Sequence, residues 1–372
     1  MIGDVQLQFR YCSAVFQPPE CPETGSTPMT AQALFAPAMV RALELAQNGP
    51  ERGINPRVGC VLVDSSGTIV AEGWHQGSGT PHAEVMALTG LRDKGISAAG
   101  LTAVVTLEPC AHTGKTGPCA TALIDAGIAR VVFSVSDPGV GSGGGADILR
   151  SAGIDVVSGV EEAAGRELIE RWLLSATTGR PWITIKWAMS LDGRAAAADG
   201  TSQWITGPET RHRVHLDRSR HDAIVVGTGT VLADDPTLTA RDRDGSLMDH
   251  QPHAVVVGQR AVPDTALLRT HPGGFTHHDS HDLDHLMESL FHQGIRSAYV
   301  EGGPTLASAF VAQGLCDEVH ISLGPMLLGG PKLALTDLGV STMAEALPLD
   351  IHDVLRFESD VFIIAKPRKD DA

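Results

Sequence analysis

Hydrophobic residues follow two alternating spacings through the first part of the chain. Helical spacing runs through "LFAPAMVRALELAQNG", which ends at the helix-stopping pair Asn48-Gly49, and again through "HAEVMALTGLRDKG" and "CATALIDAG". Short β-branched runs lie among these segments. They are "VGCVLVDSSGTIVAEGWH", whose Ser-Ser-Gly predicts a hairpin, and the expected strands "TAVVTLE" and "RVVFSVSD". This alternation predicts helices layered on a β-sheet.

The same alternation continues towards the C-terminus. A glycine-rich loop in "GVGSGGGADILRSAGIDVVSGV" precedes a short helix and a strand, and one helix through "EEAAGRELIERWLLSAT" leads to "TGRP". New strands are expected at "PWITIKWAMS", "DAIVVG", "HAVVVG", "SAYVEGG" and "EVHISLGP", with helices between them and a closing hairpin in "DVLRFESDVFIIAKP". We therefore predict two α/β domains, 29–177 and 178–372, preceded by a loose extension, 1–28.

Residues 242 to 285 differ from their surroundings. They are rich in Asp, His, Pro and Gly, which predicts long surface loops. Seven histidines lie between residues 250 and 285, but their irregular spacing favours a solvated loop over a metal site.

The composition is that of a soluble globular protein, with 42% hydrophobic and 19% charged residues in a chain of 372. No run of about eighteen apolar residues occurs, and the N-terminus lacks the pattern of a signal peptide, so we expect a cytoplasmic protein with no membrane partner. A net charge of −16 and the lack of a basic run argue against nucleic-acid binding. The six cysteines are too scattered for a disulfide framework, so a metal site better explains any close pair.

Three side chains have the character of a catalytic zinc site. His82 begins a helix in "PHAEVMAL", and Cys110 and Cys119 each follow a proline in "TLEPCAHTGKTGPCATALIDAG". One imidazole and two thiolates suit Zn²⁺ and leave a fourth position for a water that ionises near neutral pH. A closed structural zinc site would need a fourth Cys or His, and Cys60 lies in the apolar run "VGCVLV", which predicts a core position.

Glu84, two residues after His82, favours catalysis over a structural role. At a helix start its carboxyl should lie near the open metal position, where it can take a proton from the water and then pass one to the ring nitrogen and on to the departing amine. H-x-E followed by P-C-x-x-C is the signature of zinc nucleobase deaminases. The sequence therefore predicts one zinc ion per chain and a deaminase reaction.

The gap between the two cysteines is unusually long. Eight residues, "AHTGKTGP", stand where two to four usually separate zinc ligands. They include His112 and Lys115 among small neighbours, and such a loop suits a phosphate or a sugar hydroxyl of the substrate. The alternative is a solvated loop without a ligand. If the loop binds, the substrate is a phosphorylated pyrimidine.

Seven blocks of the sequence together resemble the bifunctional deaminase/reductase family of riboflavin biosynthesis. In order along the chain they are "NPRVGCVLV", "PHAEV", "TLEPCAHTGKTGPC", "KWAMSLDGR", "SQWIT", "TVLADDPTLTAR" and "VEGGPTLASAF". The resemblance covers nearly everything from about residue 35 to 366. It implies a cytidine-deaminase-like three-layer α/β domain followed by a dihydrofolate-reductase-like α/β domain.

The resemblance implies two successive reactions. Zinc-dependent deamination converts 2,5-diamino-6-(5-phosphoribosylamino)pyrimidin-4(3H)-one to its uracil form, and NADPH then reduces the ribosyl group to give 5-amino-6-(5-phosphoribitylamino)uracil. For the first domain it implies that Asn55 contacts the pyrimidine, that Glu84 moves the proton, and that zinc is bound by His82, Cys110 and Cys119.

The second domain carries weaker signals of its own. "SAYVEGGPTLASAF" predicts a strand, a glycine turn and a helix N-terminus that suits a phosphate, but it is not G-x-G-x-x-G, and a tight turn without a ligand explains it equally well. The resemblance implies that NADPH meets Ala188, Trp204, Thr230, Asp234, Gly303, Pro304, Thr305, Leu306, Ala307, Ser308 and Ala309. It implies that the phosphoribosyl substrate meets Ser202, Arg218, Leu238, Arg241 and Glu301, and two arginines can hold its phosphate bidentately.

Two further residues and two departures complete the comparison with the family pattern. Lys186 and Asp192 lie in matching blocks, and for each of them a salt bridge within the fold is slightly preferred over direct catalysis. After "SDP" the family usually has a second proline and an Asn, whereas this chain has "GVGSGGG", which predicts a more flexible loop beside the deaminase pocket. Gly117 stands where a proline is common.

Three other functions compete with the bifunctional enzyme. The first is a zinc deaminase of another small pyrimidine or purine with a non-reductase C-terminal domain, against which the intact C-terminal blocks argue. A nucleic-acid-editing deaminase is disfavoured by the acidic charge, and a zinc-stabilised scaffold would have no activity to lose on substitution of Glu84. Apolar strands left over in a two-site protein suggest a homodimer.

Overall fold

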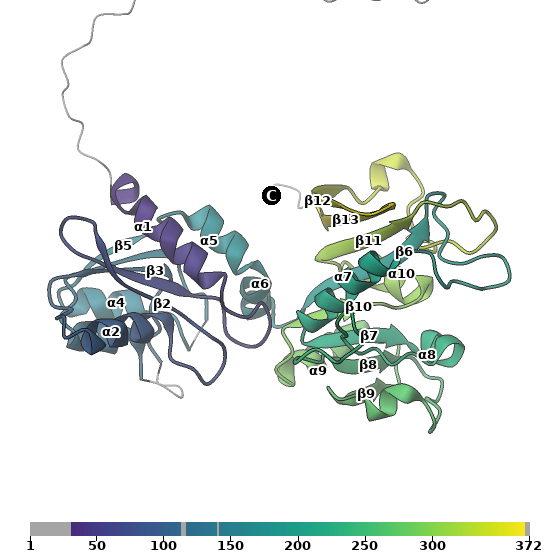
Figure 1. Cartoon of the computed structure of the whole chain (residues 1–372), viewed down its shortest axis with the longest axis horizontal. Helices are drawn as coiled ribbons and strands as arrows, with labels where there is room; N and C mark the ends of the chain where they lie inside the picture. Colours follow the sequence, from purple (N-terminus) through teal and green to yellow (C-terminus); the bar gives the residue numbers. More distant parts are fainter. Residues whose placement is uncertain (1–30, 113–116, 140, 369–372) are drawn as a thin grey trace, which may run out of the picture.

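The computed structural model describes residues 31–112, 117–139 and 141–368, which form two α/β units side by side (Figure 1). The predicted extension, 1–28, and Lys115 lie outside these residues. Among the described residues, no helix combines the length and apolar character needed to cross a membrane.

The first unit is a five-stranded sheet in the order β2-β1-β3-β4-β5. The predicted hairpin is confirmed, because β1 and β2 pair antiparallel, and β1 also pairs antiparallel with β3. The strands β3, β4 and β5 run parallel, as helical crossovers require. The strands are β1 (Gly59–Val63), β2 (Ile69–Trp74), β3 (Thr102–Leu107), β4 (Arg130–Val135) and β5 (Asp155–Ser158).

Helices cover both faces of this sheet, which makes the unit three-layered. Cys60 and Leu62 of β1 pack towards the layer formed by α2, α3 and α4, whereas Val61 and Val63 pack towards α1 and α5. Because side chains alternate between the faces of a strand, a strand buried on both faces is apolar throughout, and "VGCVLV" is such a run. The helices are α1 (Ala31–Ala46), α2 (Ala83–Asp93), α3 (Cys119–Asp125), α4 (Gly145–Ser151) and α5 (Glu162–Leu168).

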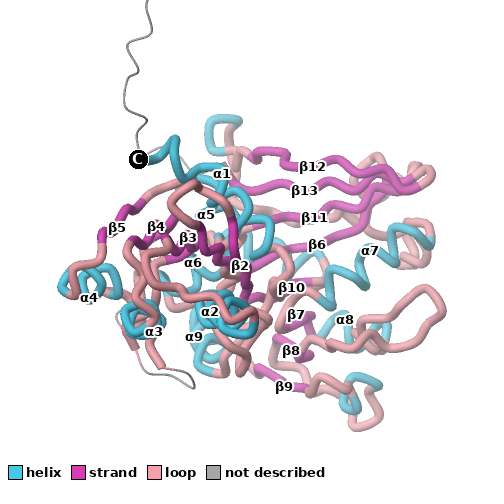
Figure 2. The backbone as a smooth tube through the Cα atoms, turned by 60° about the vertical axis from the view of Figure 1, so that its left-hand side comes forward, coloured by secondary structure: helices cyan, strands magenta, loops and turns pink. Residues whose placement is uncertain are grey.

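The single helix predicted through residues 161–177 is wrong, because the chain bends there. Helix α5 ends at Leu168, α6 (Glu170–Thr178) follows, and Ile169 between them has φ −110° and ψ 18°. Ile169 is buried against Leu107 and Val135. The bend turns α6 towards the second unit (Figure 1), which the chain enters at β6 (Trp182–Ser190), and Figure 2 shows the sheet of that unit as a stack of strands.

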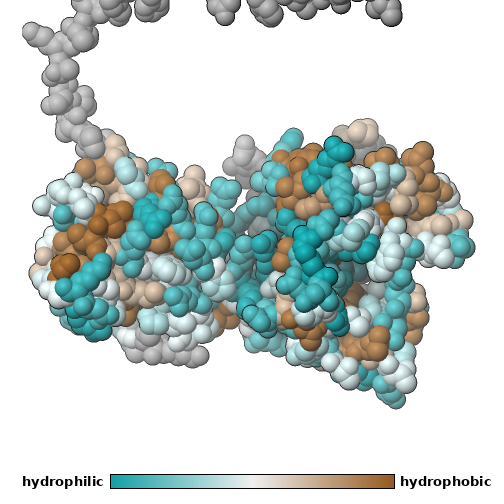
Figure 3. Space-filling view, viewed as in Figure 1, coloured by the Kyte–Doolittle hydropathy of each residue, from teal (hydrophilic) through white to brown (hydrophobic). Residues whose placement is uncertain are grey.

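Polar contacts join the two units. Arg171 of α6 pairs with Glu318 at 3.1 Å, and Lys366 pairs with Glu170. On the face shown in Figure 3, hydrophilic side chains predominate at the junction. Interfaces between domains of one chain are commonly polar in this way.

The second unit is an eight-stranded sheet in the order β12-β13-β11-β6-β10-β7-β8-β9, and its strands from β11 to β9 run parallel. The predicted closing hairpin is β12–β13. The prediction of loops through residues 242–285 is wrong for β9, a short edge strand whose "FTHH" has no apolar alternation. The strands are β6 (Trp182–Ser190), β7 (Ala223–Gly227), β8 (His253–Val257), β9 (Phe275–His278), β10 (Ser297–Val300), β11 (Glu318–Gly324), β12 (Leu349–Phe357) and β13 (Asp360–Pro367).

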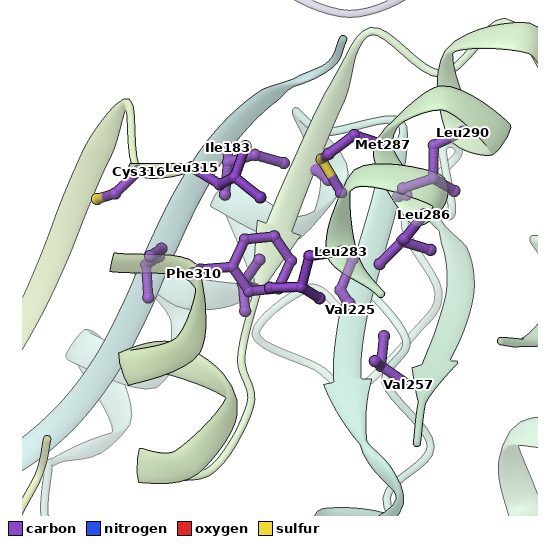
Figure 4. Close-up of a cluster of buried hydrophobic side chains, with 14 of the residues drawn as sticks. Ile183, Val225, Val257, Leu283, Leu286, Met287, Leu290, Phe310, Leu315 and Cys316 are labelled. Carbon is purple, nitrogen blue, oxygen red and sulfur yellow. The ribbon is translucent and has the colours of Figure 1, made fainter. Parts of the chain in front are cut away.

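A core cluster fixes the carboxyl ends of the central strands. Figure 4 shows Leu283 and Leu286 of α9 near Val225 and Val257, with Phe310 of α10 beside them. Such helical stripes hold the strand ends, and the loops after them, in place. The helices of this unit are α7 (Pro208–Ser219), α8 (Thr228–Asp234), α9 (Leu283–His292) and α10 (Pro304–Ala312).

Candidate functional site

The three predicted zinc ligands converge beside the carboxyl end of β3. His82 precedes α2, Cys110 follows β3, and Cys119 is the first residue of α3. The His82 Nδ1 lies 3.2 Å from the Cys119 Sγ and 3.6 Å from the Cys110 Sγ, and all three ligand atoms lie within 4.8 Å of one another. Ligands bound tetrahedrally at zinc distances lie roughly 3.5 Å apart, so this donor set fits Zn²⁺. In the part of the chain that the structure describes, the histidines of 250–285 form no such group.

The Cys110 thiol is acidic. A hydrogen bond from the Cys119 thiol, opposed by burial and assisted by His82, lowers the pKa of Cys110 to about 4. The backbone N–H of Cys119 also points to the Cys110 Sγ, 3.4 Å away. Because the thiolate is the form that binds a metal, Cys110 is suited to its predicted role.

Glu84 lies beside the three predicted zinc ligands but is not one of them. Its side chain is buried next to the Cys119 thiol. Burial raises the pKa of Glu84 above that of an ordinary glutamate. A carboxyl with a raised pKa next to a metal site is suited to carry a proton during turnover.

His75, which the sequence analysis did not single out, supports Asn55. The Asn55 Nδ2 donates to the His75 Nε2 at 2.9 Å, and the other ring nitrogen of His75 lies 3.1 Å from the carbonyl oxygen of Pro81. The His75 ring also packs edge-on against His82, with centroids 5.3 Å apart. In the sequence it is a histidine at the end of "EGWH", seven residues before His82, and nothing in that pattern points to Asn55. Asn55 is thereby held beside the zinc ligands.

Glu108 ties the glycine-rich loop to the turn that carries Cys110. Its carboxylate accepts from the backbone N–H groups of Asp137 (3.1 Å), Gly144 (3.2 Å) and Ala146 (3.0 Å). A Cβ added to Gly145 would lie 1.7 Å from the Pro109 carbonyl oxygen, so only glycine allows this approach. These contacts hold Gly144, Gly145 and Ala146 against the turn after β3, and the flexibility expected of the loop stays a prediction.

The predicted substrate loop between the cysteines is described only at its ends. His112 is exposed, and Lys115 lies outside the described residues. Contact of these two residues with a phosphate stays a prediction.

A cavity of about 1160 Å³ opens at the carboxyl ends of the parallel strands in the second unit. Most of the predicted contact residues line it. They are Ala188, Ser202, Trp204, Arg218, Thr230, Asp234, Leu238, Arg241, Glu301, Gly303, Pro304, Thr305, Leu306 and Ala309. Ligands of parallel α/β sheets characteristically bind at this end.

Two predicted cofactor contacts do not reach the cavity. Ala307 and Ser308 are buried on the opposite side of α10, and the Ser308 hydroxyl accepts from the backbone N–H of Thr336 at 2.8 Å. Residues 303–309 were predicted as a continuous run of cofactor contacts. They belong to the start of helix α10, so only one face of this run can contact a ligand. The prediction is corrected for these two residues.

A buried ion pair lies at the floor of this cavity. Arg218 donates to both oxygens of Glu301, at 2.6 and 2.9 Å, and the Lys186 Nζ lies 3.9 Å from the same carboxylate. Burial alone would raise the pKa of Glu301, but Arg218 and Lys186 hold it at about 2. The guanidinium of Arg218 is therefore engaged by Glu301, whereas that of Arg241, which also lines the cavity, donates to the Thr239 hydroxyl at 3.0 Å and to the Gly245 carbonyl oxygen at 2.7 Å.

The two residues interpreted as salt-bridge partners differ in outcome. Lys186 forms a salt bridge with Glu301, as predicted. Asp192 instead accepts from the backbone N–H groups of Leu328 (3.1 Å) and Gly329 (2.7 Å), which anchors the segment after β11. The salt-bridge prediction is wrong for Asp192.

The cavity has the chemistry that a dinucleotide phosphate requires. Gly303 stands at the N-terminus of α10 with Pro304 in its first turn, so free N–H groups point outward there. Arg260 and Lys332, which the sequence analysis missed, add two cations to the lining. These residues fit NADPH.

Comparison with known proteins places both units in one family. The zinc-binding region of cytidine and deoxycytidylate deaminases matches residues 36–135, and the RibD C-terminal domain matches residues 181–363. The riboflavin biosynthesis protein RibD of Corynebacterium ammoniagenes is 43% identical over 327 residues, covering 87% of this chain and 94% of its own.

Two solved structures agree with this over the whole fold. RibD of Acinetobacter baumannii (form 1) superposes with a TM-score of 0.82 at 35% identity, covering 91% of this chain and 100% of that one. A diaminohydroxyphosphoribosylaminopyrimidine deaminase/5-amino-6-(5-phosphoribosylamino)uracil reductase of Thermotoga maritima gives 0.78 at 32% identity, again over 91% and 100%.

Proposed function

This chain belongs to the RibD family of bifunctional riboflavin biosynthesis proteins, and on that premise we propose that the zinc-ligand trio and the large cavity are its two active sites. The protein deaminates the 2,5-diaminopyrimidinone phosphoribosyl substrate and reduces the ribosyl group of the product with NADPH. The supporting observation is that His82, Cys110 and Cys119 meet beside the buried Glu84. We place the deaminase domain at 29–177 and the reductase domain at 178–372, and the cytoplasmic location stays a prediction.

In the deaminase domain, His82, Cys110 and Cys119 would hold the zinc ion, which supplies an activated water. Glu84 takes one proton from that water and delivers it to the ring nitrogen, and it then takes the proton of the hydroxyl group added to the ring carbon and delivers it to the departing amine. Asn55, held by His75, orients the pyrimidine through its carboxamide. His112 and Lys115 contact the phosphoribosyl part.

In the reductase domain, NADPH supplies the hydride. The N-terminus of α10, from Gly303 to Leu306, binds a phosphate of the cofactor. Glu301, ionised and fixed by Arg218, accepts hydrogen bonds from the ribose hydroxyls, and Arg241 holds the substrate phosphate. Ser202 and Leu238 complete the substrate side of the cavity.

The test is to add the diaminopyrimidinone substrate to the enzyme with NADPH. We expect ammonia and NADP⁺ in equal amounts, with ammonia formed first. Ammonia release without NADPH oxidation would favour the other interpretation, a deaminase whose second domain has a different task.

Replacement of Arg218 should damage both the reductase site and the fold. Arg218→Gln leaves the Glu301 carboxylate, 10% exposed, with Lys186 as its nearby cation, so we expect a loss of about 3 kcal/mol in unfolding free energy. Reductase kcat/KM should fall at least tenfold, roughly the effect of misplacing one charged contact. Denaturant unfolding and the two half reactions measure this.

The matched control is Arg213→Gln. Arg213 lies on the same helix and pairs with the buried Asp217 at 3.0 Å, but it does not line the cavity. It should lose stability and keep the reductase KM. Equal reductase losses in both variants would show that Arg218 acts only on folding.

We also propose that the protein forms a homodimer through the edge of its second sheet. β12 is the outermost strand, and Ile351 and Val354 on it are 63% and 57% exposed. Met343, just before this strand, is 90% exposed, and Figure 3 shows hydrophobic side chains over this part of the unit. An exposed apolar edge strand is a ready site for a second copy of the chain.

Light scattering on the eluting protein tests the dimer. Wild type should have about twice the 39.1 kDa mass of one chain, and Ile351→Lys with Val354→Lys should have the mass of one chain. Ile96→Lys, at an exposed apolar position of the first unit, is the control. A wild-type monomer would refute the proposal.

A further inference from the structure

The loop between α1 and β1 lies at the junction and carries Asn55. Residues 50–57 form neither helix nor strand. Behind them is a cavity of about 220 Å³, bordered by Gly53, Asn55 and Arg57 on one side and by Trp182 and Ser297 on the other. Because a cavity adjoins the loop, packing contacts are missing on that side, and individual hydrogen bonds contribute more to its position.

One of these hydrogen bonds crosses between the two units. The backbone N–H of Gly53 donates to the Asp222 Oδ1 at 2.9 Å. The other carboxylate oxygen of Asp222 accepts from the backbone N–H groups of Arg296 and Ser297 and from the Ser297 hydroxyl, each at 3.0 Å. Three donors from its own unit hold the carboxylate still, so it is a rigid acceptor for the loop.

The loop has a second anchor on the other side of Asn55. The Arg57 Nη2 donates to the carbonyl oxygen of Leu168 at 3.0 Å, within the deaminase unit. Asn55 therefore lies between Arg57, which is bonded to Leu168 of its own unit, and Gly53, which is bonded to Asp222 of the reductase unit. Among the described residues, the Asn55 side chain itself hydrogen-bonds to His75.

We propose that Asp222 of the reductase unit is a positioning residue for the deaminase reaction, because it fixes through Gly53 the loop that presents Asn55 to the pyrimidine. The inference rests on the proposed role of Asn55. It assigns to the second unit a part in the first reaction, in addition to its own.

Asp222 is remote from the reductase cavity. It precedes β7, whereas Thr228 and Gly229, which follow β7, line the cavity. A strand of five residues, Ala223–Gly227, separates the two ends by about 16 Å at the usual rise per residue. A change at Asp222 should therefore affect the deaminase and leave hydride transfer intact.

The experiment measures the two half reactions separately in the zinc-loaded full chain. Asp222→Ala should raise the deaminase KM about tenfold, the effect of one hydrogen bond to a charged acceptor, with a much smaller change in kcat. NADPH oxidation with the deaminated substrate should be unchanged. An unchanged deaminase KM, or parallel losses in both half reactions, would overturn the proposal.

Asp317→Ala is the matched control. Asp317 is also a carboxylate at the amino end of the sheet, where it accepts from the Ile183 backbone N–H at 2.8 Å and pairs with Arg180 at 2.6 Å. In the described part of the chain, it makes no hydrogen bond or ion pair with the loop 50–57. This variant should therefore keep the wild-type deaminase KM, and a matching rise in KM would overturn the proposal.

A double-mutant cycle separates this inference from the role of Asn55 itself. If Asp222 acts through Asn55, Asp222→Ala should raise the deaminase KM in wild type and have little further effect in Asn55→Ala. Additive effects would refute the proposed route. If Asn55→Ala alone keeps the wild-type KM, the assignment of Asn55 to the pyrimidine fails, and the inference fails with it.

Discussion

Glu84→Gln is expected to lower the deaminase kcat by roughly a thousandfold, within the range that proton transfer by a positioned side chain contributes. The amide has nearly the shape of the carboxyl but cannot accept and return a proton. Glu84 is buried beside the three ligands and is not one of them, so the variant should still bind zinc. Ammonia release measures the loss, and metal analysis measures the zinc content.

The second active site supplies the internal control for this variant. NADPH oxidation with the deaminated substrate should proceed at the wild-type rate, because Glu84 lies outside the cavity of the second unit. Deaminase activity that survives the substitution would remove Glu84 from the role of proton carrier. Loss of both activities together would point to misfolding.

Removal of zinc should stop the deamination and leave the reduction intact. A chelator should stop NADPH oxidation when the diaminopyrimidinone is supplied, because the deaminated intermediate no longer forms. The same chelated enzyme should still oxidise NADPH when the deaminated substrate is supplied, since His82, Cys110 and Cys119 all belong to the first unit. Added Zn²⁺ should restore the full sequence.

Two outcomes would contradict this expectation. Ammonia release that persists after metal analysis shows the zinc to be gone would exclude a zinc-dependent deaminase. Loss of NADPH oxidation with the deaminated substrate would mean that the metal supports the whole chain rather than one reaction. Thermal unfolding of the chelated protein distinguishes the second case from a direct effect on the reductase site.

Elements with a strong local pattern were predictable from the sequence. The β1–β2 hairpin follows from two apolar runs around Ser-Ser-Gly, and both faces of β1 are buried as its uninterrupted apolar run indicates. The break at Ile169 and the strand β9 were missed for a common reason. Each depends on packing against distant parts of the chain, Leu107 and Val135 in one case and β8 in the other.

The same distinction applies to the sites. The zinc ligands and Glu84 were found because metal chemistry restricts both residue type and order along the chain. His75 and Glu108 act through contacts with Asn55 and with a glycine-rich loop, and ordinary polar residues give no such signal. The hydrogen bond between Gly53 and Asp222 joins residues 169 positions apart, and no local pattern announces it.

The two units meet at one end of the second sheet, whereas its cavity opens at the other. The deaminase unit and the reductase cavity therefore lie at opposite ends of this sheet. Because the two units are fused, each chain supplies one deaminase domain and one reductase domain. Each intermediate that the deaminase releases also starts its diffusion within a molecular diameter of a reductase site. The covalent link therefore keeps the two successive enzyme activities in equal amounts from the moment the chain is translated.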